Sequence, residues 1–312
     1  MKKENIFTIP ALYRDDFRVR GFKFGSGEKS LAVVGSLRGN EFQQIYMCSL
    51  LVKRLKKLEE DDMIAPGNEI LVIPSLNPYS MNIGKRFWPT DNTDINRMFP
   101  GYDLGETTQR IAAAAFDVVS EYDRGIQFAS FYMPGRYLPH VHIMETGFET
   151  AQKALGFGLP YVILRKPRPY DTTTLNYNWQ IWETDAFSLY AATTGTIDDL
   201  SAGIIVDSVI RYLKAESIVR GEIKDEVNTR IASDDEMVSV RPVKAGIFKS
   251  VVDVGVSVKK GEKIAYIIDA YEGGVIEEIT SPESGRIFFV HSDPMTYANT
   301  AVFKILKDPR QL

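Results

Sequence analysis

The chain has 312 residues, of which 44% are hydrophobic and 25% charged, and its formal net charge is −4. This is ordinary soluble composition, with room for one large or two modest domains. The negative charge gives no reason to expect nucleic acid, no apolar run is long enough to cross a membrane, and the N-terminus lacks a signal-peptide core. The single cysteine, Cys48, fits a reducing compartment, so a cytoplasmic location is expected.

The first two thirds of the chain alternate apolar runs with stretches of helical periodicity. Strands are expected at residues 31–34, 70–74, 125–131, 141–144, 161–164 and 187–191, and helices at 40–61, 107–122, 149–155 and 198–213. This alternation predicts an α/β layered domain, which we assign to residues 1–235. The aromatic stretch 166–185 is predicted to be a loop over the binding site, which in such sheets lies at the carboxyl ends of the strands.

The composition changes in the last quarter of the chain. Short β-rich runs alternate with glycine turns over residues 236–312, which predicts a small β-barrel or sandwich. The pattern resembles a biotinyl/lipoyl-like hammerhead. The expected hairpin tip, Asp269-Ala270-Tyr271, has no lysine, so a swinging-arm role is not expected. We expect this domain to pack beside the site or to form a homo-oligomer interface.

The stretch 77–101 follows a buried strand and carries several directed polar groups. Arg86, Asn96 and Arg97 can converge from this loop, and guanidinium and amide groups are suited to binding a carboxylate. The alternative is that the arginines pair with acidic residues and hold the loop together. The acidic residues available for this are Asp91, Asp94 and Asp103.

The run Asp94-Ile95-Asn96-Arg97-Met98-Phe99-Pro100-Gly101, preceded by Asn77-Pro78 and Arg86, resembles the substrate-binding signature of the succinylglutamate desuccinylase/aspartoacylase family. That family belongs to the zinc carboxypeptidase clan. The resemblance extends over almost the whole chain. It implies a carboxypeptidase-like mixed sheet flanked by helices, and a zinc-dependent hydrolase of amide bonds. It assigns carboxylate binding to Arg86, Asn96 and Arg97. Arg38 and Arg136 are expected to add positive charge.

The metal-binding motifs of that family are altered in this chain. Family members use His-Gly-x-Glu and a later histidine as zinc ligands, with a glutamate as general base. Here Arg38-Gly39-Asn40-Glu41 retains Glu41 but has arginine in the histidine's place, Ala129 replaces the later histidine, and Tyr190 falls where the base is expected. Arginine and alanine offer zinc no lone pair, and a phenol is a poor base at neutral pH. No zinc or other cofactor is therefore expected.

Two questions stay open at the altered motif. Arg38 either pairs with Glu41, which places a fixed cation where the metal's charge would be, or is a solvated loop residue. A relocated metal site is the other alternative. His140 and His142 share one face of a predicted strand, and Glu145 could join them if the strand bends.

The residues leave three hypotheses for function. The favoured one is a protein that binds a small carboxylate or acyl amino acid without the usual zinc hydrolysis, because the carboxylate signature survives while the metal ligands do not. The second is an active metal-dependent amidohydrolase with relocated ligands. The third is a structural or interaction protein. Whether the chain is an enzyme is left open by the sequence.

Overall fold

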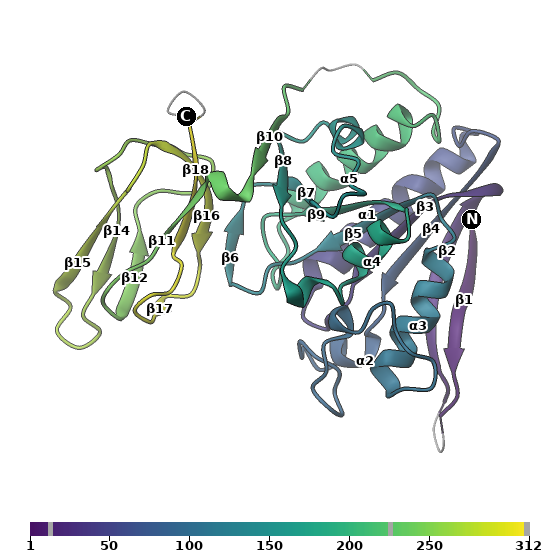
Figure 1. The fold of residues 1–312 in the computed structure, drawn as a ribbon, viewed down its shortest axis with the longest axis horizontal. Helices are drawn as coiled ribbons and strands as arrows, with labels where there is room; N and C mark the ends of the chain where they lie inside the picture. Colours follow the sequence, from purple (N-terminus) through teal and green to yellow (C-terminus); the bar gives the residue numbers. More distant parts are fainter. Residues whose placement is uncertain (12–14, 224–226, 309–312) are drawn as a thin grey trace. The chain divides into compact units, whose positions relative to one another are not determined.

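The computed structural model describes residues 1–11, 15–223 and 227–308 (Figure 1). The chain divides into two compact units. Residues 1–130 and 139–231 form the first, and residues 131–138 join the rest of the chain from residue 232 onward in the second. The sequence-based division after residue 235 does not include the short segment 131–138 in the second unit.

Nine described strands form the central sheet of the first unit, in the order β1-β2-β4-β3-β5-β9-β7-β8-β10. Their bounds are β1 Lys2–Ile9, β2 Phe17–Gly25, β3 Gly27–Ser36, β4 Gly67–Ser75, β5 Arg124–Ala129, β7 His140–Met144, β8 Tyr161–Arg165, β9 Asp185–Tyr190 and β10 Arg230–Ser233. Strands β4, β3, β5 and β9 run parallel, whereas β7 is antiparallel to β9. The predicted mixed sheet flanked by helices is therefore confirmed.

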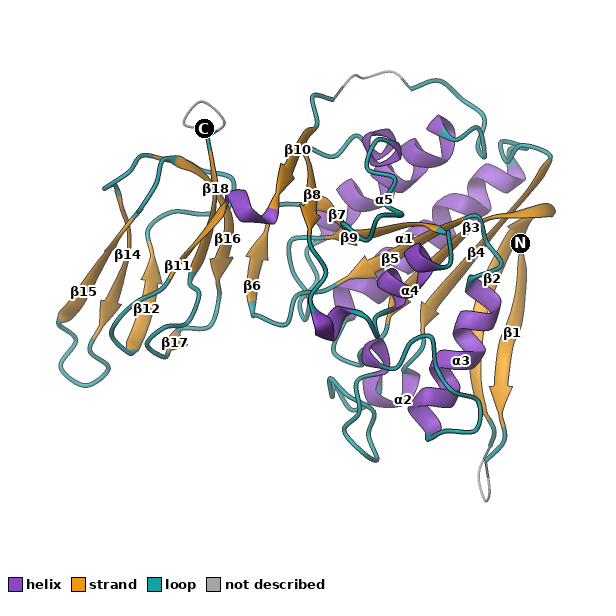
Figure 2. Ribbon diagram, in the orientation of Figure 1, coloured by secondary structure: helices purple, strands orange, loops and turns teal. Residues whose placement is uncertain are grey.

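Helices cover both faces of this sheet (Figure 2). They are α1 Phe42–Glu60, α2 Pro78–Met81, α3 Thr107–Val119, α4 Leu175–Ile181 and α5 Asp199–Ala215, with short 3-10 helices at Ile95–Arg97, Lys153–Phe157 and Pro169–Asp171. A further 3-10 helix, Asp234–Glu236, belongs to the second unit. Alternate residues of β3 pack against the helices on opposite faces of the sheet. Leu31 and Val33 pack with α1 and α5, while Ala32 and Val34 pack with α3 and α4. No helix among the described residues is long and apolar enough to span a membrane.

Two sequence-based expectations on the first unit were wrong. The helix expected at 149–155 is the short 3-10 helix Lys153–Phe157. The stretch 166–185 is not an irregular loop, because it contains α4, whose Trp179 is fully buried and donates a hydrogen bond from its indole N–H to the Val119 carbonyl at 3.2 Å. The tryptophan is therefore part of the core.

The second unit is built from strands in two sheets. One has the order β11-β18-β16-β13 with β6 paired to β16, and the other the order β15-β14-β12-β17. The strands are β6 Gly135–Tyr137, β11 Met237–Val240, β12 Gly246–Ser250, β13 Ser257–Val258, β14 Lys263–Ile268, β15 Val275–Thr280, β16 Gly285–His291, β17 Met295–Thr296 and β18 Phe303–Lys307. The two sheets share one apolar core. A barrel or hammerhead-like form for this unit stays a prediction.

Candidate functional site

The residues singled out by the sequence motifs lie at one edge of the sheet in the first unit. Strands β3, β4, β5 and β9 run parallel, so their carboxyl ends meet at this edge. Arg38 follows β3, the stretch 77–101 follows β4, Ala129 ends β5, and Tyr190 ends β9. In the β5–β9 register, Ala129 and Tyr190 are direct neighbours.

Arg38 is buried, with 5% of its surface exposed, and is held by two carboxylates. Its Nη1 donates to Glu41 Oε1 at 3.0 Å, and its Nε and Nη2 donate to Asp94 Oδ2 at 3.0 and 2.9 Å. Burial disfavours the charge, but the two carboxylates outweigh it and raise the pKa of Arg38 above its usual value. The guanidinium is therefore a permanent, paired cation, and the alternative of a solvated loop residue was wrong.

The carboxylate of Glu41 is fully engaged by this network. Its Oε2 accepts hydrogen bonds from the backbone N–H groups of Leu37 and Arg38 at 2.8 and 3.0 Å, and its Oε1 accepts one from the Ser130 hydroxyl as well as the Arg38 guanidinium. The side chains at positions 38, 41 and 129 are thus a guanidinium, a saturated carboxylate and a methyl group. This donor set does not fit a zinc ion, which needs several free lone pairs from the protein.

Tyr190 lies between two histidines on one face of the sheet. Its ring stacks on His140 with centroids 5.0 Å apart, and meets His142 edge-on at 5.8 Å. Burial raises the pKa of Tyr190 to about 12, although the positive charges of Arg165 and Arg38 act in the opposite direction. At neutral pH the hydroxyl is protonated and so is a hydrogen-bond donor, not a base.

The relocated set His140, His142 and Glu145 is not gathered into a metal-binding group. Nε2 of His142 accepts a hydrogen bond from Nε of Arg165 at 3.3 Å, and His140 is 1% exposed against Tyr190. Among the residues that the structure describes, no three histidine, cysteine or acidic side chains are grouped so that they could hold a metal ion.

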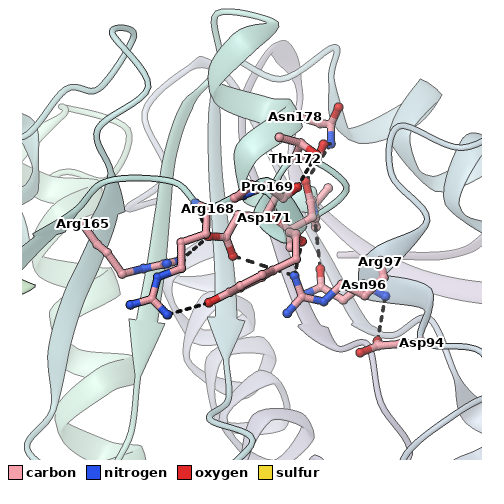
Figure 3. A network of polar contacts seen from close by, with 12 residues as sticks. Asp94, Asn96, Arg97, Arg165, Arg168, Pro169, Asp171, Thr172 and Asn178 are labelled. Carbon is pink, nitrogen blue, oxygen red and sulfur yellow. Dashed lines mark hydrogen bonds and ion pairs between the residues drawn. The ribbon is translucent and has the colours of Figure 1, made fainter. Parts of the chain in front are cut away.

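Asn96 and Arg97 both make contacts with the chain segment around α4 (Figure 3). The Asn96 Oδ1 accepts a hydrogen bond from the N–H of Leu175, the first residue of α4, at 3.3 Å. Arg97 donates to the Tyr170 carbonyl, lies 5.3 Å from the centre of the Tyr170 ring, and has Asp171 at 3.8 Å. These two side chains thus fasten one loop to the other.

Asp171 is a functional candidate that the sequence reasoning missed. It is buried, and it lies between Arg97 and Arg165, the last residue of β8 (Figure 3). Arg165 Nη2 approaches its Oδ2 at 2.8 Å, and the backbone N–H of Arg168 donates to the same oxygen at 2.8 Å. Two arginines and a lysine close to one acid in residues 165–171 were the available signal. Of the three acids that the alternative offered as partners within the loop, Asp94 pairs with Arg38, whereas Asp91 and Asp103 are exposed.

Arg86 differs from the other arginines of the site because no carboxylate pairs with it in the described part of the chain. Its side chain is half-buried, and its guanidinium lies 5.4 Å from the centre of the Phe87 ring. Burial and the nearby charge of Arg38 lower the pKa of Arg86. A bound anion would offset both effects.

Arg136 belongs to the second unit, where it lies on β6. Its Nη1 is 3.2 Å from Oδ2 of Asp253. The part expected of Arg136 in anion binding stays a prediction.

Comparisons with known proteins agree with this fold. The catalytic-domain model of succinylglutamate desuccinylase/aspartoacylase matches residues 27–126, which hold Arg38, Glu41, Arg86 and the loop that ends at residue 101. An N-alpha-acetyl-L-2,4-diaminobutyric acid deacetylase from Halomonas elongata is 25% identical over 279 residues, covering 81% of this chain and 74% of that protein.

Solved structures show the same fold over the whole chain. A succinylglutamate desuccinylase/aspartoacylase from Rhodobacter sphaeroides has a TM-score of 0.80 at 17% identity, covering 98% of this chain and 95% of its own. The product-bound ectoine utilization protein EutE (DoeB) from Ruegeria pomeroyi has a TM-score of 0.78 at 19% identity, covering 96% and 93%.

The fold is that of an α/β protein of the desuccinylase/aspartoacylase type. Over residues 27–126 the chain matches the catalytic domain of the succinylglutamate desuccinylase/aspartoacylase family.

Proposed function

We propose that this chain binds a small carboxylate, in particular an N-acyl amino acid, at Arg86 without zinc-dependent hydrolysis. The match to the family's catalytic domain and the deacetylase relative support a hydrolase-like protein of N-acyl amino acids. The absence of the usual zinc chemistry and the carboxylate specificity are our inferences from the residues at the strand ends.

The observation that carries the proposal is the state of Arg86. A half-buried guanidinium without a carboxylate partner among the described residues loses hydration without gaining an ion pair. A ligand carboxylate can supply the missing partner with two parallel N–H···O hydrogen bonds. Arg38 and Arg97 already have protein partners, so Arg86 is the arginine that a ligand can engage at least cost.

The second part of the proposal concerns hydrolysis. Arg38 is a fixed cation paired with Asp94 and Glu41, and it offers no lone pair to a metal ion that could activate water. Tyr190 stands where the general base is expected, and its hydroxyl keeps its proton at neutral pH. The residues present therefore suit binding of an intact amide better than its cleavage.

Isothermal titration of a panel of N-acetyl amino acids against the full chain tests this proposal. We expect saturable binding by carboxylates, none by the corresponding amides, and a loss of affinity of at least about tenfold in Arg86→Gln, because a charged hydrogen-bond pair is removed. Arg54→Gln, at an exposed ion pair with Asp207, is the matched control. Release of free amino acid by the wild-type chain would contradict the non-hydrolytic part of the proposal.

Two further properties belong with this proposal. A cytoplasmic location and a homo-oligomer formed by the second unit stay predictions. Light scattering coupled to size-exclusion chromatography will determine the oligomeric state.

A further inference from the structure

Arg86 lies in a cluster of charged side chains whose net charge can be counted. The charges acting most strongly on Arg86 come from Arg38, Asp94, Glu41 and Arg97. Arg97 connects these to Asp171 and Arg165 through ion pairs of 3.8 and 2.8 Å. The arginine cluster, as we call it, contains the following residues: Arg38, Glu41, Arg86, Asp94, Arg97, Arg165 and Asp171.

The cluster holds four arginines and three carboxylates, so its net charge is one positive. Arg38 is bound on two sides by Glu41 and Asp94. Arg97 and Arg165 share Asp171. Of the four arginines, only Arg86 has no carboxylate partner in the described chain, so it is where a ligand can balance the excess charge. Arg168 lies outside this count because it is exposed and its charge is screened by solvent.

We propose that the site selects ligands with one carboxylate, that is, N-acyl amino acids with an uncharged side chain, and disfavours dicarboxylates. This inference rests on the proposed function. A single carboxylate at Arg86 neutralises the cluster. No unpaired guanidinium of the arginine cluster is then left for a second carboxylate, which has to compete with Glu41, Asp94 or Asp171 for an arginine.

The physical cost of a second carboxylate is that of a desolvated charge without a partner. Displacing a protein carboxylate from its arginine leaves that carboxylate buried and unpaired, which is strongly unfavourable. Glu41 is 2% exposed and Asp171 is 3% exposed, so neither can turn to solvent in place. Like charges brought together at a binding site are an effective means of rejecting the wrong ligand.

Isothermal titration with a matched pair of ligands tests the inference. N-acetyl-L-glutamine and N-acetyl-L-glutamate have the same length and differ in one charge. We expect the glutamine compound to bind about tenfold or more tightly than the glutamate compound at neutral pH. N-acetyl-L-asparagine and N-acetyl-L-aspartate repeat the comparison at a shorter length, so that side-chain length does not decide the result.

The outcomes separate this inference from the proposed function. Equal or tighter binding of the dicarboxylates would overturn the charge inference and leave carboxylate binding intact. If none of the four compounds binds, the proposed function itself fails.

A charge variant provides the second readout. Asp171→Asn raises the net charge of the cluster to two, so we expect the preference for the monocarboxylate to fall at least severalfold. Asp91 is an exposed acid of the loop, and Asp91→Asn, the control, should keep the wild-type ratio of the two affinities. A natively folded Asp171→Asn chain with the wild-type ratio would overturn the inference. If that variant does not fold, Asp94→Asn makes the same charge change and is judged by the same criterion.

Discussion

At the scale of single residues, the site is organised by which arginine already has a partner. Arg38, Arg97 and Arg86 all lie near one another, yet only the last is left without a carboxylate in the described chain. Sequence patterns show that arginines are present, but the pairing depends on distances of a few ångströms. The permanent, paired charge of Arg38 in particular helps to hold the structure of the first unit together.

Replacing Arg38 should be costly to the fold. Arg38→Gln leaves Glu41 and Asp94 without their common cation in a buried place, so we expect the free energy of unfolding to fall by about 3–5 kcal/mol. Urea denaturation followed by circular dichroism measures this change. The exposed pair of Arg54 and Asp207 is the control, and Arg54→Gln should cost less than about 1 kcal/mol. Similar losses in both variants would contradict a special role for Arg38.

Tyr190 should contribute to the loss of stability in alkali. The folded-state pKa of about 12 lies above the ordinary value of 10.0. Its contribution to stability is therefore fully present below pH 10.0 and is lost as the pH rises through about 12. Denaturation curves for the wild type and Tyr190→Phe should diverge in this window, with the wild type losing more stability. Parallel pH profiles would show that the phenol does not titrate as expected.

At the scale of elements, the position of α4 is the feature that connects core and site. The N-terminus of α4 is bound by Asn96, and its Trp179 is buried under the sheet. A Cβ atom added at Gly125, on β5, would lie 2.7 Å from the Trp179 ring. The glycine is therefore needed for the close approach of strand and helix.

Glycine substitutions test this packing. Gly125→Ala should lower the free energy of unfolding by about 1–3 kcal/mol, because the methyl group overpacks the contact with Trp179. Gly203, inside α5, has no atom within 4 Å of an added Cβ, so Gly203→Ala should instead stabilise the chain by about 0.5–1 kcal/mol. Thermal or urea unfolding measures both. A neutral Gly125→Ala would mean that Trp179 moves at no cost.

At the scale of the whole molecule, the chain forms two compact units that differ in how their helices and sheets pack. The first unit sandwiches a mixed sheet between helices, and the second packs two sheets on one apolar core. The arginine cluster lies entirely within the first unit. All of its charged side chains except Arg86 are ion-paired within the chain, so the fold should not depend on a metal ion.

Metal addition and removal test this independence in the full chain. A ligand that binds only the folded state raises the unfolding temperature. We expect neither zinc nor a chelator to change the Tm of the wild type, because positions 38 and 129 offer zinc no lone pair. Elemental analysis after dialysis should find no stoichiometric zinc. Retained zinc with a chelator-sensitive Tm would contradict the expectation and direct attention to His140 and His142.

Several features of this protein follow from local sequence patterns alone. Apolar runs and helical periodicity were enough to predict the α/β class, and the motif ending at Gly101 was enough to find the loop at the site. The arginine at position 38 and the alanine at position 129, where the family resemblance predicts histidines, are likewise visible without coordinates. These signals are local because side-chain period and motif spacing are properties of short segments.

The pairing of side chains and of strands, by contrast, is visible only in the folded chain. Arg97 meets Asp171, which lies far along the chain, and segment 131–138 joins the second unit because β6 pairs with β16. Neither pairing has a local signature, since any of several nearby acids or strands satisfies the same sequence pattern. Arg86 is identified as the unpaired cation only once Glu41 and Asp94 are seen to bind Arg38 and Asp171 to bind both Arg97 and Arg165, because ion pairing depends on distance in space.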